Sequence, residues 1–236
     1  MDLRTRVTIL SESADRDGPA GAVMRPGDPV GITRVRHPGH GATRLMRIMQ
    51  TNACSLSCGY CPTFCGGKVR RTFLAPEEVA RVFMDARRGG LADGLFLTSG
   101  VPGRAAKMTD RMLAAVDLLR RREKFDGYIH LKLLPGTEPD QVDAAVRLAN
   151  RVSVNLEAPA DTYVRALARE KDLSGDLLPN LERAGRLMRE RRLRGDPADI
   201  ASVGTTTQFV VVSLARETRP RIPARREHGS GGRGNG

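Results

Sequence analysis

The residues of this 236-residue chain best suited to chemistry are its four cysteines, all of which lie between positions 54 and 65. Cys54, Cys58 and Cys61 form a C-x3-C-x2-C pattern, and Tyr60 stands directly before the third cysteine. Thiolates are soft ligands that select zinc or iron–sulfur clusters. Cysteines so close together cannot join distant elements as a disulfide framework does. The clustering therefore predicts a metal or redox centre.

The spacing favours an iron–sulfur cluster over three other kinds of site. Three thiolates on one compact loop leave one cluster iron free for an external ligand. A structural zinc site is one alternative, with Cys65 as the fourth thiolate. A redox pair of Cys58 and Cys61 is another, and it requires a helix N-terminus at the pair. Inert buried cysteines are the third, although three within one glycine-containing loop pack a core poorly. We expect Cys65 to be an incidental thiol.

The spacing of apolar residues along the sequence predicts the helices and strands that position this loop. Apolar runs of strand length alternate with segments of helical period, which predicts βα units and a parallel sheet. The first predicted strand leads directly into the cysteines, so the loop is expected at the carboxyl edge of the sheet. The predicted strands cover residues 44–50, 94–98, 128–133, 152–156 and 206–212, and the predicted helices cover 75–88, 108–124, 139–150 and much of 161–193.

We expect three parts in the chain. Residues 1–42 read as an N-terminal extension with one short helix at 3–14 and little core, residues 43–215 as the catalytic core, and residues 216–236 as a disordered basic tail. The segment from His37 to His40 reads as a linker and not as a metal site. No helix pattern follows the fifth strand, so nothing in the sequence is expected to cover that strand.

Charge and hydropathy limit the classes of partner. The formal net charge is +12 and the pI is about 10.5. Solvated arginine-rich faces explain this excess, and nucleic-acid binding is the alternative. No apolar run approaches the roughly 20 residues of a membrane span, and the N-terminus has no secretory pattern. We therefore expect a cytoplasmic protein with no membrane partner.

The cysteine motif, on the loop after the first barrel strand, resembles that of the radical S-adenosylmethionine (SAM) superfamily. In that family three cysteines bind three irons of a [4Fe-4S] cluster, SAM chelates the fourth, and reduction yields a 5'-deoxyadenosyl radical that abstracts hydrogen from a substrate. The resemblance implies an α/β fold, a partial TIM-like barrel of the (β/α)6 type. It also implies both cofactors and an electron donor such as flavodoxin or ferredoxin.

Four further segments, residues 95–101, 127–132, 153–157 and 207–211, resemble one subgroup that is assigned to DNA modification or repair. The resemblance runs from about Gly31 to Ala215 and implies a nucleic-acid substrate. Two alternatives stay open. The chain is then either a non-enzymatic metal or nucleic-acid-binding protein with a structural cluster, or an inactive truncated remnant.

The resemblance also implies residues that contact SAM, while no general base or other catalytic side chain is identified. Most of them lie at or near the carboxyl end of a predicted strand, where barrel enzymes assemble their sites. Strand-exit turns and a structural hydrogen-bond network are the alternatives for these positions, and His130 reads as a core histidine. The implied SAM contacts are Tyr60, Thr98, Ser99, Gly100, Lys132, Ser153, Asn155, Glu157 and Gln208.

Overall fold

The computed structural model describes residues 1–15, 31–37, 41–194 and 203–211. They form one six-stranded sheet in the order β1-β2-β3-β4-β5-β6. β1 pairs antiparallel with β2, and all later neighbours pair parallel. The sheet is not closed among the described residues, which confirms the expected partial barrel. The strands are β1 (Ile32–His37), β2 (Gly41–Met49), β3 (Gly94–Thr98), β4 (Ile129–Lys132), β5 (Arg151–Ser153) and β6 (Gly204–Thr206).

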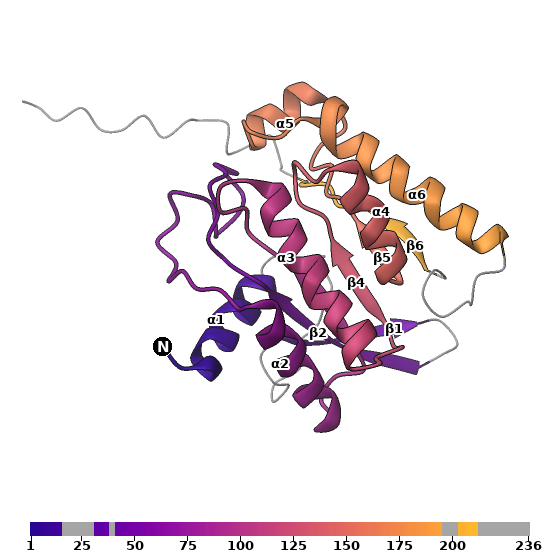
Figure 1. Ribbon diagram of the computed structural model, residues 1–236. Coiled ribbons are helices and arrows are strands. Elements are labelled where there is room, and N and C mark those ends of the chain that lie inside the picture. Colours follow the sequence, from indigo (N-terminus) through magenta and orange to yellow (C-terminus); the bar gives the residue numbers. More distant parts are fainter. Residues whose placement is uncertain (16–30, 38–40, 195–202, 212–236) are drawn as a thin grey trace, which may run out of the picture.

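A layer of helices covers one face of this sheet. Each parallel strand neighbours the next one in the sequence, and right-handed crossovers then place all connecting helices on the same side. Figure 1 shows α2, α3, α4 and α6 side by side in this layer. The helices are α1 (Leu3–Asp15), α2 (Pro76–Arg88), α3 (Ala105–Asp117), α4 (Pro139–Leu148), α5 (Asp161–Leu167) and α6 (Leu178–Leu193), with short π-helical turns η1 (Leu118–Arg122) and η2 (Leu173–Leu177).

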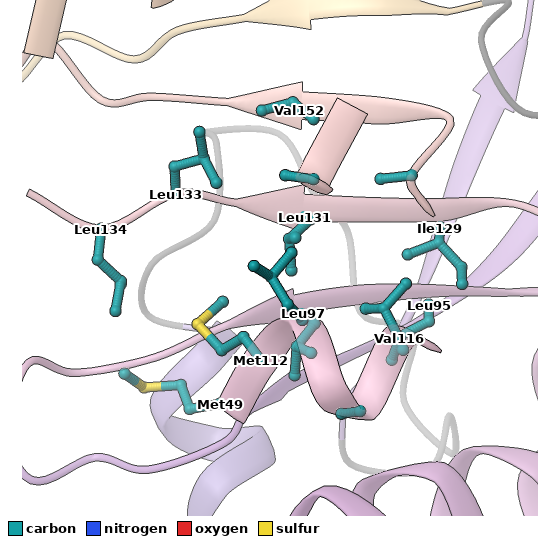
Figure 2. Packing of buried hydrophobic residues seen from close by; sticks show 14 of the residues in the cluster. Met49, Leu95, Leu97, Met112, Val116, Ile129, Leu131, Leu133, Leu134 and Val152 are labelled. Carbon is teal, nitrogen blue, oxygen red and sulfur yellow. The ribbon is translucent and has the colours of Figure 1, made fainter. Parts of the chain in front are cut away.

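The core lies between the sheet and this helix layer. Ile48, Leu97, Leu131 and Val152 share one register row across four strands, and all four are fully buried. Figure 2 shows Met112 of α3 beside this row. Each such side chain contributes about 1.5–3 kcal/mol through burial. This row fixes the register that brings the carboxyl ends of the strands to one edge.

The other face of the sheet carries a second, more polar row. The Arg47 guanidinium lies 4.7 Å from the centre of the Phe96 ring, which meets the His130 ring edge to face at 4.8 Å. His130 Nε2 lies 2.8 Å from Ser153 Oγ. Burial lowers the pKa of His130 to about 3, so the ring is neutral near pH 7. His130 is therefore a half-buried residue of the sheet that pairs with Ser153.

The N-terminal part contributes more to the core than the sequence indicates. Leu10 and Ala14 of α1 are fully buried, and the Ala14 carbonyl accepts a hydrogen bond from Arg47. β1 was not among the predicted strands, because its residues Ile-Thr-Arg-Val-Arg-His do not alternate between apolar and polar types. The segment 38–40 and the tail 216–236 lie outside the described residues. Among the helices that the structure describes, none has both the length and the apolar character of a membrane span.

Candidate cluster and cofactor site

The cysteine loop leaves the carboxyl end of β2 and is held to the exit of β3 by backbone hydrogen bonds. The Gly100 amide donates to the Thr51 carbonyl at 2.7 Å, and the Ser55 amide donates to the Val101 carbonyl at 2.8 Å. These bonds continue the β2–β3 ladder past the end of the strands. The first half of the cysteine loop is therefore anchored to the edge of the sheet.

Arg71 closes the second half of the loop. Its guanidinium donates to the carbonyl oxygens of Asn52, Thr63, Phe64 and Gly67. A planar guanidinium has five donors in a fixed fork and can satisfy several carbonyls at once. Arg71 thus ties the chain before the cysteines to the chain after them. Its role was not predicted, because one arginine in a basic sequence carries no distinguishing signal.

The three motif cysteines open on one cleft. Cys54, Cys58 and Cys61 all line it, whereas the exposed Cys65 does not. Burial raises the pKa of the Cys58 thiol, and the nearby Lys171 charge opposes that rise. Three thiols spread around one cleft fit a cluster, in which each sulfur binds a different iron. No three His, Cys, Asp or Glu side chains of the described residues gather as they would around a single metal ion.

The cleft beside the thiols opens to solvent. It holds about 800 Å³ when the open space at its mouth is counted. Its walls come from the carboxyl ends of successive strands. Seven of the nine residues implied as SAM contacts line it: Tyr60, Thr98, Ser99, Gly100, Lys132, Asn155 and Glu157.

The remaining two implied contacts lie elsewhere. Ser153 does not line the cleft, and its hydroxyl pairs with His130. Gln208 does not line it either, but its backbone carbonyl accepts from the Glu157 amide at 3.1 Å. The sequence placed Ser153, Asn155 and Glu157 in one alternating row. Regular strand geometry ends at Ser153, so the next residues reach the cleft by a loop and not by alternation.

Gly100 has a packing requirement of its own. A Cβ built on this residue would lie 2.3 Å from the Ala53 carbonyl oxygen and 3.3 Å from the Cys54 Cβ. Only glycine allows the β3 exit to approach the cysteine loop this closely. The resemblance implied a close approach to SAM, and the structure shows a close approach to the loop that carries Cys54.

Two buried acceptors in the cleft lack partners among the described residues. Glu157 is 1% exposed; its Oε1 lies 2.6 Å from Lys171 Nζ, while its Oε2 is buried without a hydrogen bond, as is Asn155 Oδ1. A buried acceptor without a partner costs about 1–3 kcal/mol. A ligand that presents hydroxyl or amino donors would remove this cost. SAM carries such groups on its ribose and its methionyl end, so the cleft fits it.

Tyr60 connects the cysteine loop to this carboxylate. Lys171 Nζ donates to the Tyr60 hydroxyl at 2.9 Å. Burial, and then the Glu157 charge, raise the pKa of Tyr60 far above its ordinary value, so the phenol stays protonated. Lys171 was not predicted, since it lies in a run of four charged residues, 169–172, that is typical of a solvated surface.

Comparison with known proteins supports the fold and the family. HydG, the FeFe-hydrogenase maturase from Carboxydothermus hydrogenoformans, shares 16% identity and a TM-score of 0.50 over 59% of this chain and 32% of its own. Methylornithine synthase (PylB) shares 16% identity and a TM-score of 0.50 over 69% of this chain and 42% of its own. At such identities the likeness concerns the fold alone. The chain spans less than half the length of these structures, and no curated protein matches it.

The family model described as the radical SAM superfamily matches residues 48–193. This range contains the cysteine loop, the parallel strands β3 to β5 and all the cleft residues of those strands. Members of the family use a [4Fe-4S] cluster and SAM, the two groups that the thiols and the cleft fit. On the motif, the fold and this match, the chain belongs to the radical SAM superfamily.

Proposed function

We propose that this chain is a radical SAM enzyme that cleaves SAM reductively and abstracts hydrogen from a substrate. The observation that carries the proposal is the shared cleft, on which three thiols and two unpartnered buried acceptors open together. Cys54, Cys58 and Cys61 would hold the cluster. Glu157 and Asn155 would accept hydrogen bonds from SAM.

A [4Fe-4S] cluster held by Cys54, Cys58 and Cys61 would supply one-electron reduction for the cleavage of SAM. The residues of the chain itself would bind SAM, orient it and shield it from water. Met49, Val101, Leu133 and Leu134 form apolar walls of the cleft, which exclude water from a reactive species. The electron would come from a donor protein such as flavodoxin or ferredoxin. The cytoplasmic location expected from the sequence stays a prediction.

The proposal is tested by measuring SAM cleavage with protein that has been reconstituted anaerobically with iron and sulfide. With dithionite as reductant, we expect methionine and 5'-deoxyadenosine to form in equal amounts. Omission of dithionite should abolish both products. A reconstituted protein that holds a full cluster yet forms neither product would contradict an enzymatic role and favour a structural cluster.

A basic rim supports the finer proposal of a nucleic-acid substrate. Exposed lysines and arginines lie on the cysteine loop and at the start of α3, next to residues that line the cleft, and the described residues form no ion pair with them. By contrast, exposed arginines such as Arg88 and Arg121 have acidic partners. Uncompensated positive charge attracts phosphates. The rim consists of Lys68, Arg70, Arg104 and Lys107.

We predict that the rim sets the salt dependence of nucleic-acid binding. Replacing Lys68, Arg70, Arg104 and Lys107 together by glutamine should weaken binding of a fluorescent single-stranded DNA. It should also lower the slope of log affinity against log salt by roughly 3. Fluorescence anisotropy over a salt series measures both quantities.

The matched control removes two ion-paired arginines of η1, with Arg121→Gln and Arg122→Gln. Because η1 precedes β4, it lies toward the opposite end of the sheet. The control should leave the slope unchanged. A fall of the slope in the control of about half that in the rim variant, in proportion to two charges against four, would indicate non-specific charge attraction. No binding by the unmodified chain would remove nucleic acid as the substrate class.

A further inference from the structure

We propose that Lys171 is a positioning residue that holds the Glu157 carboxylate beside the cleft with one oxygen unpartnered and links it to the cysteine loop. The inference deepens the proposed function and rests on it, because it concerns how the chain presents Glu157 to SAM. Lys171 lies between α5 and η2 and belongs to no motif. It is nevertheless 8% exposed, which is unusual for lysine.

The contacts of Lys171 explain its burial. Its ammonium lies 2.6 Å from Glu157 Oε1 and 2.9 Å from the Tyr60 hydroxyl, and 5.7 Å from the centre of the Tyr60 ring. A buried cation requires an opposite charge and further polar contacts. Here all of them come from two places, the cysteine loop and the chain beyond β5. One ammonium therefore joins two walls of the cleft.

Both the backbone and the side chain of Glu157 are held in place. The Glu157 backbone has φ 65°, in the left-handed region that residues other than glycine rarely adopt. The Glu157 amide donates to Gln208, and the Glu157 carbonyl accepts from Val210 at 2.7 Å. Lys171 then engages Oε1 alone, while Oε2 stays buried without a partner in the described chain. Such strain persists where the surroundings determine the geometry, often at functional sites.

Leu167 and Glu170, which lie close to Lys171 in the sequence, accept hydrogen bonds from the cysteine loop but form none with Glu157. The Leu167 carbonyl accepts from the Gly59 amide at 3.0 Å. The exposed Glu170 carboxylate accepts from the Ser57 amide at 3.1 Å and from its hydroxyl at 3.0 Å. Glu170 thus provides a matched comparison, because it contacts the loop but not the carboxylate.

The test compares Lys171→Met with Glu170→Gln in the full chain. In reconstituted protein, Lys171→Met should keep its iron and sulfide content. It should bind SAM at least about tenfold more weakly, because Glu157 is no longer held in place and its charged hydrogen bond to SAM is lost. Glu170→Gln should bind SAM within about threefold of the unmodified chain. Equal SAM affinity in Lys171→Met and the unmodified chain would overturn the proposal.

A double variant addresses the case in which Lys171→Met fails to fold because it leaves Glu157 unpaired. Lys171→Met with Glu157→Gln removes both charges and should fold. If Lys171 acts through Glu157, the double variant binds SAM no more weakly than Glu157→Gln alone. A further loss of about tenfold in the double variant would show that Lys171 acts independently, against the proposal.

Hydrogen exchange of the chain without cofactors separates this inference from the proposed function. Loss of the Lys171 side chain, in the single or the double variant, should speed exchange both in residues 55–61 and in 154–159, whereas Glu170→Gln should speed it only in 55–61. If the unmodified chain binds no SAM, the proposed function fails, and the exchange pattern still decides whether Lys171 links the two walls. Unchanged exchange in 154–159 would overturn the link.

Discussion

Replacing Cys58 by serine is expected to reduce bound iron and sulfide from about four of each per chain to nearly none. Cys58 is the most buried of the three motif thiols, so no solvent ligand can take its place. Iron and sulfide analysis after anaerobic reconstitution, together with the visible absorption of the cluster, measures the loss. Cys54→Ser and Cys61→Ser should also lower the iron and sulfide content, because each removes one of the three cluster thiolates.

Cys65→Ala is the matched control for this loss. Cys65 is exposed and does not line the cleft, so the variant should keep full cluster content and SAM-dependent activity. A structural cluster or a zinc site would need Cys65 as its fourth thiolate. Loss of the metal in Cys65→Ala would therefore contradict the open iron site and support the non-enzymatic alternative.

The second large effect is expected from Gly100→Ala. The added methyl would lie 2.3 Å from the Ala53 carbonyl oxygen, which is backbone and cannot rotate away. The cysteine loop must then shift from the β3 exit and lose the bond between the Gly100 amide and Thr51. We expect a fall of about 1–3 kcal/mol or more in the free energy of unfolding. Cluster content should fall as well, as Cys54 follows Ala53 directly.

Gly59→Ala is the control within the same loop. A Cβ on Gly59 would meet only the Leu167 carbonyl, at 4.0 Å, an ordinary contact. This variant should change the free energy of unfolding by less than about 1 kcal/mol and keep its cluster. Urea denaturation and iron analysis check both variants. Equal free energies of unfolding and equal cluster contents in Gly100→Ala and Gly59→Ala would show that the close packing at Gly100 does not support the cysteine loop.

The sequence predicts the parts of the fold that depend on local pattern. β3 spans the predicted residues 94–98, because a run of apolar residues there is flanked by glycine and polar residues. α2 begins at Pro76 with acids in its first turn, one residue from the expected start. β1 was not predicted, because its pairing depends on β2 and its own residues show no apolar alternation.

The candidate site is predictable only as far as motif and strand position extend. The three motif cysteines follow from their spacing, whereas Thr98, Ser99 and Gly100 were implied by the family resemblance and lie at the end of a predicted strand. Lys171 and Arg71 follow from neither, because each acquires its role through contacts with residues distant in the sequence. Asn155 and Glu157 reach the cleft by an irregular loop with a left-handed residue, which no periodic pattern encodes.

We propose that one iron of a cluster on Cys54, Cys58 and Cys61 is open to SAM. Electron paramagnetic resonance of the anaerobically reconstituted and reduced protein, with and without SAM, tests this open site most directly. We expect a [4Fe-4S] signal whose g values change when SAM is added. A cluster signal identical in the two samples would contradict the open site and indicate a closed, structural cluster.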